Sequence, residues 1–517
     1  MGILLCAKVC FLMICGKNRL YSQPKAILVN CISALNKMKI LILAFFLLSG
    51  LTPLLAQNTP QRPNVIIILM DDMGYGDTEP YGMTGIATPN FNRLAAEGTR
   101  FTHFNAAQAV CTASRAAILT GMYPNRIGMS GVLLPGAKRA LNPKEQTIAS
   151  LLNDAGYKTG MLGKWHLGNH APFLPLQYGF DSYYGIPYSH DMWPIDFDGR
   201  TRVTDTSNIR SGWSAIPVYE GNRVVDSIIT MERQSRLTSD LTERAVSFIK
   251  ENRKNPFFLY LAHPMPHVPL AASKKFQGKS GMSTFGDVIM ELDWSIGQIL
   301  ETLDKEKIFE NTLLIVTSDN GPWLHFGDHA GSSGGFKEGK GTTWEGGSRV
   351  PLLVRWPGKV RAAGIKSQLM ATMDLLPTIA AATGAELPAH KIDGFNFLPL
   401  WLGKTDEGPR DLFYYYFDDN NLRGVRYQHW KLVLPHNSAS YTGLQGKDGK
   451  PGIRTGNEVP MALYNLAHDP GENHDVQKLY PEMVKKILGF AEDAKNDLGD
   501  DLSKREGKNV RKPALIP

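Results

Sequence analysis

The sequence predicts an α/β fold in which helices cover a mostly parallel β-sheet. Runs of β-branched and other apolar residues predict strands buried on both faces, at residues 65–70, 257–261 and 313–317. Amphipathic patterns predict helices, at residues 147–155, 237–251 and 287–305. Because the strand and helix patterns alternate along the chain, they indicate a sandwich of helices around a central sheet.

The size and composition of the chain are those of an ordinary globular protein. Its 517 residues are 43% hydrophobic and 20% charged, which excludes collagen-like, coiled-coil and wholly disordered chains. After about residue 395 the pattern changes, and we expect a main domain at 57–395 and a smaller α+β domain at 396–517.

The predicted smaller domain has its own local signals. Residues 413–417 are aromatic, while 424–434 and 463–469 alternate like antiparallel strands. The stretch 437–459 is rich in Gly and Lys and predicts a surface loop. About the last twenty residues are polar, and we expect them to be frayed.

The N-terminal 56 residues predict a leader that includes a secretory signal peptide. From Met38 the sequence reads MKILILAFFLLSGLTPLLA, a short basic start followed by an apolar run and a Pro-containing stretch. The apolar run at 40–48 is well short of the ~20 residues that a membrane span needs. We therefore expect a leader at 1–56, with the signal peptide proper at 38–56, and an exported body without a membrane span. The alternative is a tail anchored by the same apolar stretch.

The leader also accounts for the charge of the chain and for most of its cysteines. Six Lys and Arg precede Ala56 with no Asp or Glu among them, and without these six, 50 basic residues face 49 acidic ones. The net charge of +7 is therefore no sign of a nucleic-acid partner. Four of the five cysteines lie in the leader, so the exported part holds Cys111 alone and cannot form an internal disulfide.

Polar or charged residues follow four of the predicted strands. In chain order they are Asp71 and Asp72, Lys164 and His166, His263 and His267, and Asp319 and Asn320. Ligands of such sheets bind beyond the carboxyl ends of the strands. A solvated loop explains any one of these groups, but four of them predict a functional site at one rim.

The segment CTASRAAILTG at 111–121 predicts a helix that begins at Cys111. Arg115 then lies one turn further on the same face, and both the helix dipole and the guanidinium favour negative charge beside the sulfur. The pattern alone leaves three interpretations open: a thiolate nucleophile, a residue that is chemically modified, or a buried packing cysteine.

The neighbourhood of Cys111 resembles the signature of the type I sulfatases, in which this cysteine is oxidised to 3-oxoalanine (formylglycine). The signature here is CTASRAAILTGMYPNRIG. Further family segments follow one another in order: NVIIILMDDMGYGD from 64, GKWHLG from 163, PYSHD from 187, HPMPHVP from 263, SDNGP from 318, GKGTTWEGG from 339 and LYNLAHDPGE from 463. The resemblance implies an alkaline-phosphatase-like sandwich, a sulfatase catalytic domain at 57–395 and hydrolysis of sulfate esters.

The same resemblance implies a metal site. The positions that match the family's ligands are Asp71, Asp72, Asp319 and Asn320, with residue 111 completing the shell. All are hard oxygen donors once residue 111 is a hydrated formylglycine, which favours one Ca²⁺ ion, with Mg²⁺ as the alternative. Asp319 would act as base toward the attacking hydroxyl.

The remaining catalytic roles are also implied by the family. Lys164 and Lys340 would hold the sulfate oxygens, and Arg115 would orient the diol. His267 would protonate the leaving alcohol. His166 would then remove the proton of the second hydroxyl of residue 111, which expels sulfate.

Several positions compete for roles or stay open. His263 competes with His267 and Lys337 with Lys340, and the family match favours the second of each pair. Candidate substrate-binding residues are His190, Asp191 and His325. Trp323, Asp328 and His329 are further candidates for the specificity pocket, with a structural role as the alternative.

Ala113 departs from the commoner motif, which has Pro at this place. The Ala form is better tolerated by anaerobic, radical-based maturases, which suggests a bacterial chain matured before export to the periplasm or medium. Exported relatives commonly desulfate glycosaminoglycans or algal polysaccharides such as ulvan and carrageenan. The alternatives are a phosphate mono- or diesterase on the same scaffold and an inactive protein that binds sulfated glycans.

Overall fold

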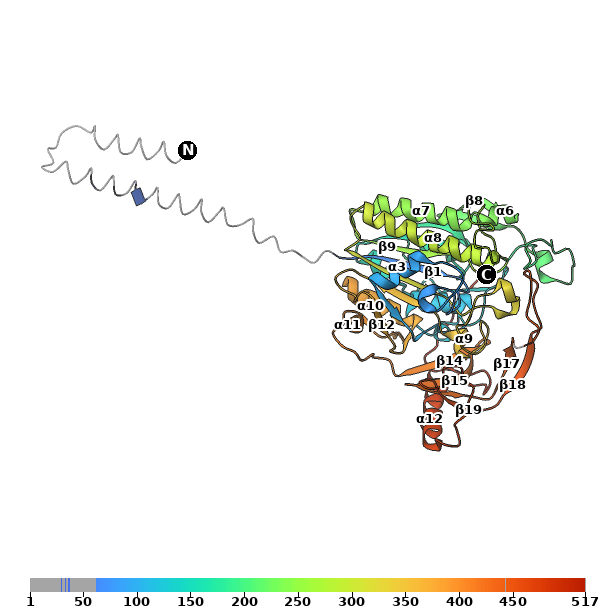
Figure 1. Ribbon diagram of the computed structural model, residues 1–517. Coiled ribbons are helices and arrows are strands. Elements are labelled where there is room, and N and C mark those ends of the chain that lie inside the picture. The colour runs from blue at the N-terminus through green and yellow to red at the C-terminus, as the bar shows by residue number, and fades with distance from the viewer. Residues whose placement is uncertain (1–28, 30–32, 34–35, 38–61, 442, 517) are drawn as a thin grey trace, which may run out of the picture. The chain divides into compact units, whose positions relative to one another are not determined.

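A ten-stranded sheet forms the centre of the structure, a computed structural model that describes residues 29, 33, 36–37, 62–441 and 443–516 (Figure 1). The strand order is β12 (Gly364–Lys366), β2 (Thr99–Phe101), β11 (Leu352–Arg355), β10 (Thr312–Ser318), β1 (Asn64–Met70), β9 (Phe257–Ala262), β5 (Lys158–Lys164), β6 (Ser182–Ile186), β7 (Ile216–Glu220), β8 (Arg223–Ile228). The five strands from β10 to β6 are parallel, and antiparallel pairing begins at β11 on one side and at β7 on the other. The predicted mostly parallel sheet is confirmed.

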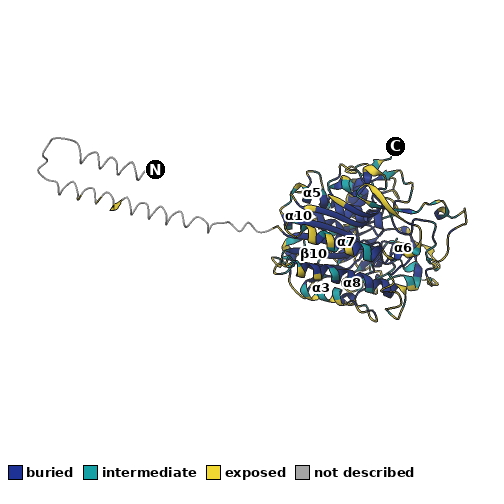
Figure 2. Ribbon diagram, turned by 90° about the horizontal axis from the view of Figure 1, so that it is seen from above, coloured by how far each residue is buried: buried dark blue, intermediate teal, exposed yellow. Residues whose placement is uncertain are grey.

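The central strands are buried on both faces because helices cover each face. In β1, Val65 and Ile67 pack into one apolar cluster while Ile66 and Ile68 pack into another. The first face carries α4 (Cys111–Thr120), α5 (Ile148–Asp154), α10 (Leu375–Thr383) and α11 (Leu398–Trp401). The second carries α3 (Pro89–Glu97), α7 (Leu237–Asn252) and α8 (Thr284–Lys305). Figure 2 shows the strands buried beneath helices whose outer sides are exposed.

A smaller antiparallel sheet follows in the C-terminal part of the chain. Its order is β14 (Leu412–Phe417), β15 (Asn421–Tyr427), β16 (Trp430–Val433), β19 (Ala462–Asn465), and α12 (Pro481–Leu498) packs against it. The expected smaller sheet is therefore present. Both sheets belong to one compact unit, Arg62–Pro517, and the domain boundary between 395 and 396 stays a prediction.

The N-terminal predictions lie almost entirely outside the described residues. The leader at 1–56 and its signal peptide at 38–56 therefore stay predictions. Within the described part of the chain, no helix combines the length and the apolar character needed to cross a membrane.

Three expectations for the C-terminal part were wrong in detail. The stretch 424–434 forms two strands, because Gln428 adopts a left-handed φ of 54° and turns the chain between β15 and β16. The expected loop at 437–459 contains the hairpin strands β17 (His436–Ser440) and β18 (Thr455–Val459). The chain end is not frayed, because β20 (Ala514–Leu515) pairs with β4 (Arg139–Ala140) and Arg511 binds the Glu145 carboxylate at 2.7 Å.

Helix α4 lies between the two sheets and begins at Cys111, as predicted. All ten of its residues are buried. Ala116 and Ile118 face the cluster under the large sheet, whereas Ala117 belongs to the cluster under the small sheet. Packing on two sides fixes the helix, and with it the place of Cys111.

We expect Ala117→Leu to lower the free energy of unfolding by about 1–3 kcal/mol, because the added methylenes have no room between α4 and the small sheet. Ala362→Leu is the matched control: Ala362 is exposed, and this change should alter stability by less than about 0.5 kcal/mol. Denaturant unfolding of both variants tests this; equal stability of the two would contradict the packing of α4.

Candidate active site

The four strand ends singled out from the sequence belong to neighbouring parallel strands, β10, β1, β9 and β5. Backbone hydrogen bonds continue the register beyond the strands: the Asp319 N–H donates to the Met70 carbonyl at 3.1 Å and the His263 N–H to the Leu69 carbonyl at 2.8 Å. The polar residues that follow these strands therefore lie at one rim, as the sequence predicted.

Three carboxylates are buried together at this rim. Asp71 and Asp319 each place an oxygen within 4.8 Å of the Cys111 sulfur and of each other, and Asp72 lies within the same distance of that sulfur. Asp71 Oδ1 and Asn320 Oδ1 are buried and have no hydrogen-bond partner among the described residues. Buried carboxylates repel one another and need compensating charge. An all-oxygen donor set with unpartnered oxygens fits a hard divalent cation such as Ca²⁺ or Mg²⁺.

Three cations face these carboxylates. Lys164 contacts Asp71, and Lys340 Nζ lies 2.7 Å from Asp72 Oδ1. Arg115 donates from Nε and Nη2 to Asp319 Oδ2 at 3.0 and 2.8 Å. The three positive and three negative charges balance, so a divalent cation would leave the site with an excess of positive charge. Such a site attracts an anionic substrate.

The neighbouring charges set the protonation of two aspartates in opposite directions. Burial raises the pKa of Asp71, but the charges of Lys164 and Arg115 outweigh it and hold the pKa well below its usual range. Burial, followed by the Asp71 carboxylate, raises the pKa of Asp319 to about 7. Two neighbouring aspartates of the rim thus differ in proton affinity, and Asp319 holds a proton more readily than Asp71.

Two residues of the rim have left-handed backbones although they are not glycine. Asp72 has a φ of 65° and His166 a φ of 61°. Such a conformation costs about 1 kcal/mol or more. It is held by hydrogen bonds from the Asp72 N–H to Asp319 Oδ1 and from the His166 N–H to the Pro187 carbonyl, both at 3.1 Å. The fold thus maintains strain at two residues of the rim, one of which, Asp72, lies within 4.8 Å of the Cys111 sulfur.

Cys111 is not a thiolate in this environment. Burial raises the pKa of its thiol to about 11, although Lys164 and Lys340 partly oppose this. The Arg115 guanidinium donates to the Asp319 carboxylate at 2.8 Å rather than to the sulfur. The unmodified residue is therefore a protonated thiol at neutral pH and a poor nucleophile.

The two candidate histidines present different nitrogens to the site. His267 Nδ1 donates to the Val268 carbonyl at 2.5 Å, because a carbonyl can only accept, and Nε2 lies 3.6 Å from Asp72 Oδ2. His166 Nε2 donates to the Leu133 carbonyl at 2.8 Å, which leaves a lone pair on Nδ1. Burial, reinforced by Lys164, lowers the pKa of His166 well below its usual range.

The competing residues lie outside this cluster. His263 Nε2 is 3.1 Å from the Ser295 hydroxyl, behind the rim. Lys337 Nζ lies 3.7 Å from the Trp344 ring centre. Geometry therefore favours His267 over His263, and Lys340 over Lys337.

The candidate substrate-binding residues divide into two groups. The His190 and Trp323 rings lie 5.4 and 5.5 Å from the His267 ring, so both border the cluster. Asp191, next to His190 in the chain, is buried, and its Oδ2 lies 3.1 Å from Arg210 Nη2. The other group lies beside the segment that follows β17. The Gly452 N–H donates to the His325 carbonyl at 2.7 Å, and the centres of the His325 and Tyr441 rings are 5.9 Å apart.

Asp328 and His329 are also turned toward this segment. Asp328 Oδ1 accepts the Asp448 N–H at 2.8 Å. Burial lowers the pKa of His329, and the nearby Asp328 and Asp448 carboxylates partly oppose this shift. Neither residue belongs to the carboxylate cluster.

The C-terminal part contributes two residues for which the sequence predicted no role at the site. Phe417, on β14, packs on Val110, Cys111 and Ala113, and the Tyr441 hydroxyl, just after β17, donates to the Lys340 carbonyl at 2.8 Å. No local motif indicates such a role for either side chain. Only the tertiary packing brings them to the site.

Buried charges tie the Lys340 loop to the smaller sheet. Lys431 on β16 lies 3.2 Å from Glu345 and 2.7 Å from Glu472. Glu345 begins the short helix α9 (Glu345–Ser348), and its N–H donates to Glu472 Oε2 at 2.7 Å. The buried carboxylate of Glu472, in the segment around 463–472, therefore anchors the loop that carries Lys340.

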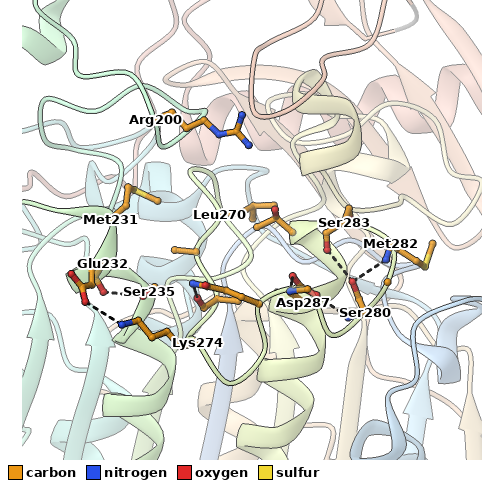
Figure 3. A pocket seen from close by; sticks show the side chains of 16 residues that line it. Arg200, Met231, Glu232, Ser235, Leu270, Lys274, Ser280, Met282, Ser283 and Asp287 are labelled. Carbon is orange, nitrogen blue, oxygen red and sulfur yellow. Dashed lines mark hydrogen bonds and ion pairs between the residues drawn. The ribbon is translucent and has the colours of Figure 1, made fainter.

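A separate hollow of about 950 Å³ lies between α6 (Met231–Ser235) and the start of α8 (Figure 3). Its carboxylates already have partners: Glu232 lies 3.6 Å from Lys274, and Asp287 accepts the N–H groups of Gly278 and Ser280. None of the described side chains that line it is a buried polar group without a partner. The hollow therefore lacks the unpartnered buried oxygens that mark the carboxylate cluster.

Family models and known proteins match this chain over both the large and the smaller sheet. The family model described as Sulfatase matches residues 63–385, and the model described as N-sulphoglucosamine sulphohydrolase, C-terminal, matches 338–489. Arylsulfatase A from Homo sapiens is 38% identical over 432 residues, covering 80% of this chain and 83% of that protein. N-acetylgalactosamine-6-sulfatase from Homo sapiens is 37% identical over 463 residues, covering 84% and 86%. The crystal structure of Ps i-CgsB in complex with k-i-k-neocarrahexaose is 30% identical, with a TM-score of 0.70 and coverage of 84% and 92%.

We expect Arg115→Met to lower the free energy of unfolding, measured with a chelator present, by about 3–5 kcal/mol, because it leaves the buried Asp319 carboxylate without its cation and Asp71 with Lys164 alone. Arg93→Met is the matched control: it breaks ion pairs with Glu97 and Asp304 that are about one-third exposed, and should cost about 1 kcal/mol or less. Similar losses in both variants would show that Arg115 does not neutralise the cluster.

Proposed function

The chain belongs to the sulfatase family of sulfuric ester hydrolases, and on that premise we propose that it is an exported bacterial enzyme that removes sulfate from carbohydrates. It uses one Ca²⁺ ion and a formylglycine made from Cys111. The observation that carries this proposal is the buried cluster in which three carboxylates and three cations surround Cys111.

Asp71, Asp72, Asp319 and Asn320 are the residues that would hold the ion. The unpartnered Oδ1 atoms of Asp71 and Asn320, and the clustering of the aspartates around residue 111, support this assignment. A bound Ca²⁺ would supply positive charge that favours loss of the proton from the attacking hydroxyl and offsets the charge of the sulfate. Ca²⁺ is favoured over Mg²⁺ because the donors come from separate segments, the ends of β1 and β10 and the start of α4, rather than from a small rigid cage.

The protonated thiol of Cys111 supports its replacement by formylglycine. Hydrated formylglycine would supply two hydroxyls: one attacks sulfur, and loss of the proton of the other re-forms the aldehyde and expels sulfate together with the first oxygen. Neither Cys nor Ser has the second hydroxyl. Ala113, two residues further on, is buried in α4 and points to a radical-based, anaerobic maturase as the partner that modifies the chain before export.

The other residues bind the sulfate and move protons. Lys164 and Lys340, each beside a carboxylate, neutralise the sulfate oxygens, and Arg115 orients residue 111. Asp319, which places a carboxylate oxygen within 4.8 Å of the residue 111 side chain, takes the proton of the attacking hydroxyl.

The two histidines complete the proton transfers. His267 protonates the leaving oxygen from Nε2, since its Nδ1 is engaged with the Val268 carbonyl. His166 accepts a proton at its free Nδ1 when sulfate departs. His190 and Trp323 border the position of the leaving alcohol.

Sulfated carbohydrates are the proposed substrates, either glycosaminoglycans or algal polysaccharides such as ulvan or carrageenan. The named relatives support this class: one is an N-acetylgalactosamine-6-sulfatase, and Ps i-CgsB was crystallised with a neocarrahexaose. The near-neutral body argues against a nucleic-acid partner. The predicted signal peptide supports a periplasmic or secreted location.

Hydrolysis of 4-nitrophenyl sulfate by protein co-expressed with a maturase tests the reaction. We expect sulfate release, preference over 4-nitrophenyl phosphate, and a loss of about a thousandfold or more in Cys111→Ala, whose melting temperature should stay close to that of the wild type. Preference for the phosphate ester would favour the phosphoesterase alternative. Binding of sulfated glycans without sulfate release would favour the binding protein.

Removal of the metal should abolish turnover, and Ca²⁺ should restore it. We expect Asp71→Asn to lose calcium binding measured by calorimetry, because it removes a charged ligand from the cluster. Asp191→Asn is the control: it also alters a buried carboxylate of this rim but should keep one bound Ca²⁺. Full activity of chelated, metal-free protein would contradict the assigned ligands.

A further inference from the structure

A cavity of about 320 Å³ adjoins the carboxylate cluster on the side of the smaller sheet. Its lining includes Gly341, Phe417, Asp418, Arg423, Ser438 and Arg454. This volume lies at the lower end of the range for small-molecule pockets, which is on the order of 300–1,000 Å³. The cavity is therefore large enough to take part of a ligand that extends out of the active site.

Two lining residues connect the cavity to the reacting centre. Gly341 directly follows Lys340, and Phe417 packs against Cys111. Gly341 has a φ of 81°, and a Cβ here would lie 3.7 Å from the Phe417 ring. A substrate whose sulfate lies between Lys340 and residue 111 would pass these residues to reach the cavity.

A β-bulge places Arg423 in the cavity wall. Tyr415 pairs with Gly424 and Tyr416 with Leu422, so Arg423 is an extra residue of β15 without a partner on β14. Bulges re-aim side chains out of the regular alternation of a strand. Leu422 and Val425 point into the core of the smaller sheet, whereas the Arg423 guanidinium is among the groups that line the cavity.

The Arg423 guanidinium is buried but incompletely paired. Its side chain is 6% exposed, and its Nε has no hydrogen-bond partner among the described residues. Its carboxylate neighbour, Asp418, lies 3.0 Å from Nη2 and is itself 69% exposed. Burying a charge with so little compensation is unfavourable, and an anion that bound here would remove this cost.

Arg454 adds a second positive charge to the same cavity. It lies just before β18 and is exposed, so it can approach a ligand without being held by the core. Together, Arg423 and Arg454 outweigh the single negative charge of Asp418 in the lining. Guanidinium groups bind sulfate and carboxylate oxygens through paired hydrogen bonds.

We propose that this cavity binds a second anionic group, a sulfate or a carboxylate, on the saccharide whose scissile sulfate lies at residue 111. The inference rests on the proposed function and narrows it: the enzyme selects saccharides that carry two negative groups. The sulfate to be removed is recognised by Lys164 and Lys340, and the retained anion by Arg423 and Arg454.

Two matched pairs of saccharides test this as competitors of 4-nitrophenyl sulfate turnover by the mature enzyme. One pair is the mono- and the disulfated neocarrabiose; the other is the 6-sulfated chondroitin disaccharide with a free and with a methyl-esterified uronate. We expect the doubly anionic member of at least one pair to bind about tenfold or more tightly. A preference in the first pair indicates a sulfate, and a preference in the second indicates a carboxylate.

Arg423→Gln should reduce this preference to less than about twofold, and Arg454→Gln should reduce it in part. Arg454 is exposed, so its variant remains informative if Arg423→Gln does not fold. Lys450→Gln is the control, because Lys450 is an exposed cation of the same hairpin connection that does not line the cavity, and it should keep the full preference.

The proposal is wrong if the wild-type enzyme distinguishes neither pair, or if folded Arg423→Gln and Arg454→Gln both retain the full preference. Failure of the proposed function gives a different result, since the wild type would then release no sulfate from 4-nitrophenyl sulfate.

Discussion

Three carboxylates buried together beside Cys111 are the constraint on which the rest of the structure depends. Neighbouring parallel strands bring Asp71, Asp72 and Asp319 to one rim, where their mutual repulsion must be balanced. Each receives a cation: Lys164 contacts Asp71, Lys340 contacts Asp72 and Arg115 contacts Asp319. Because the cations arrive from a strand end, a loop and α4, the electrostatic balance requires all three elements to be in place. The same balance leaves the pocket suited to a divalent metal and an anionic ester.

The smaller sheet is part of this arrangement. Lys431 and Glu472 hold Glu345, which anchors the loop that carries Lys340, while Phe417 packs against Cys111. Helix α4 is enclosed on both sides, so the position of residue 111 is set by packing from two sheets. Most charged residues of the site therefore come from the large sheet. The C-terminal part positions Lys340 and packs against residue 111.

Much of the fold and the site could be predicted where the local pattern is strong. Strands such as β1 are continuous apolar runs because both faces are covered, and polar residues directly after them had to meet at one rim. The failures have physical causes. The alternation at 424–434 runs through a turn made by a left-handed Gln428, and β18 is a polar hairpin strand without an apolar face. The protonated state of Cys111 depends on burial and on charges far away in the chain, which a helix-start motif does not encode.

The proposed reaction depends on residue 111 being a formylglycine and not a cysteine. Mass spectrometry of the peptide containing residue 111, on preparations with different degrees of maturation, tests it together with their rates of sulfate release. We expect the converted peptide to be lighter than the cysteine peptide by about 18 mass units, and the rate to rise in proportion to the converted fraction. A fully active preparation in which this peptide carries only unmodified cysteine would contradict the account.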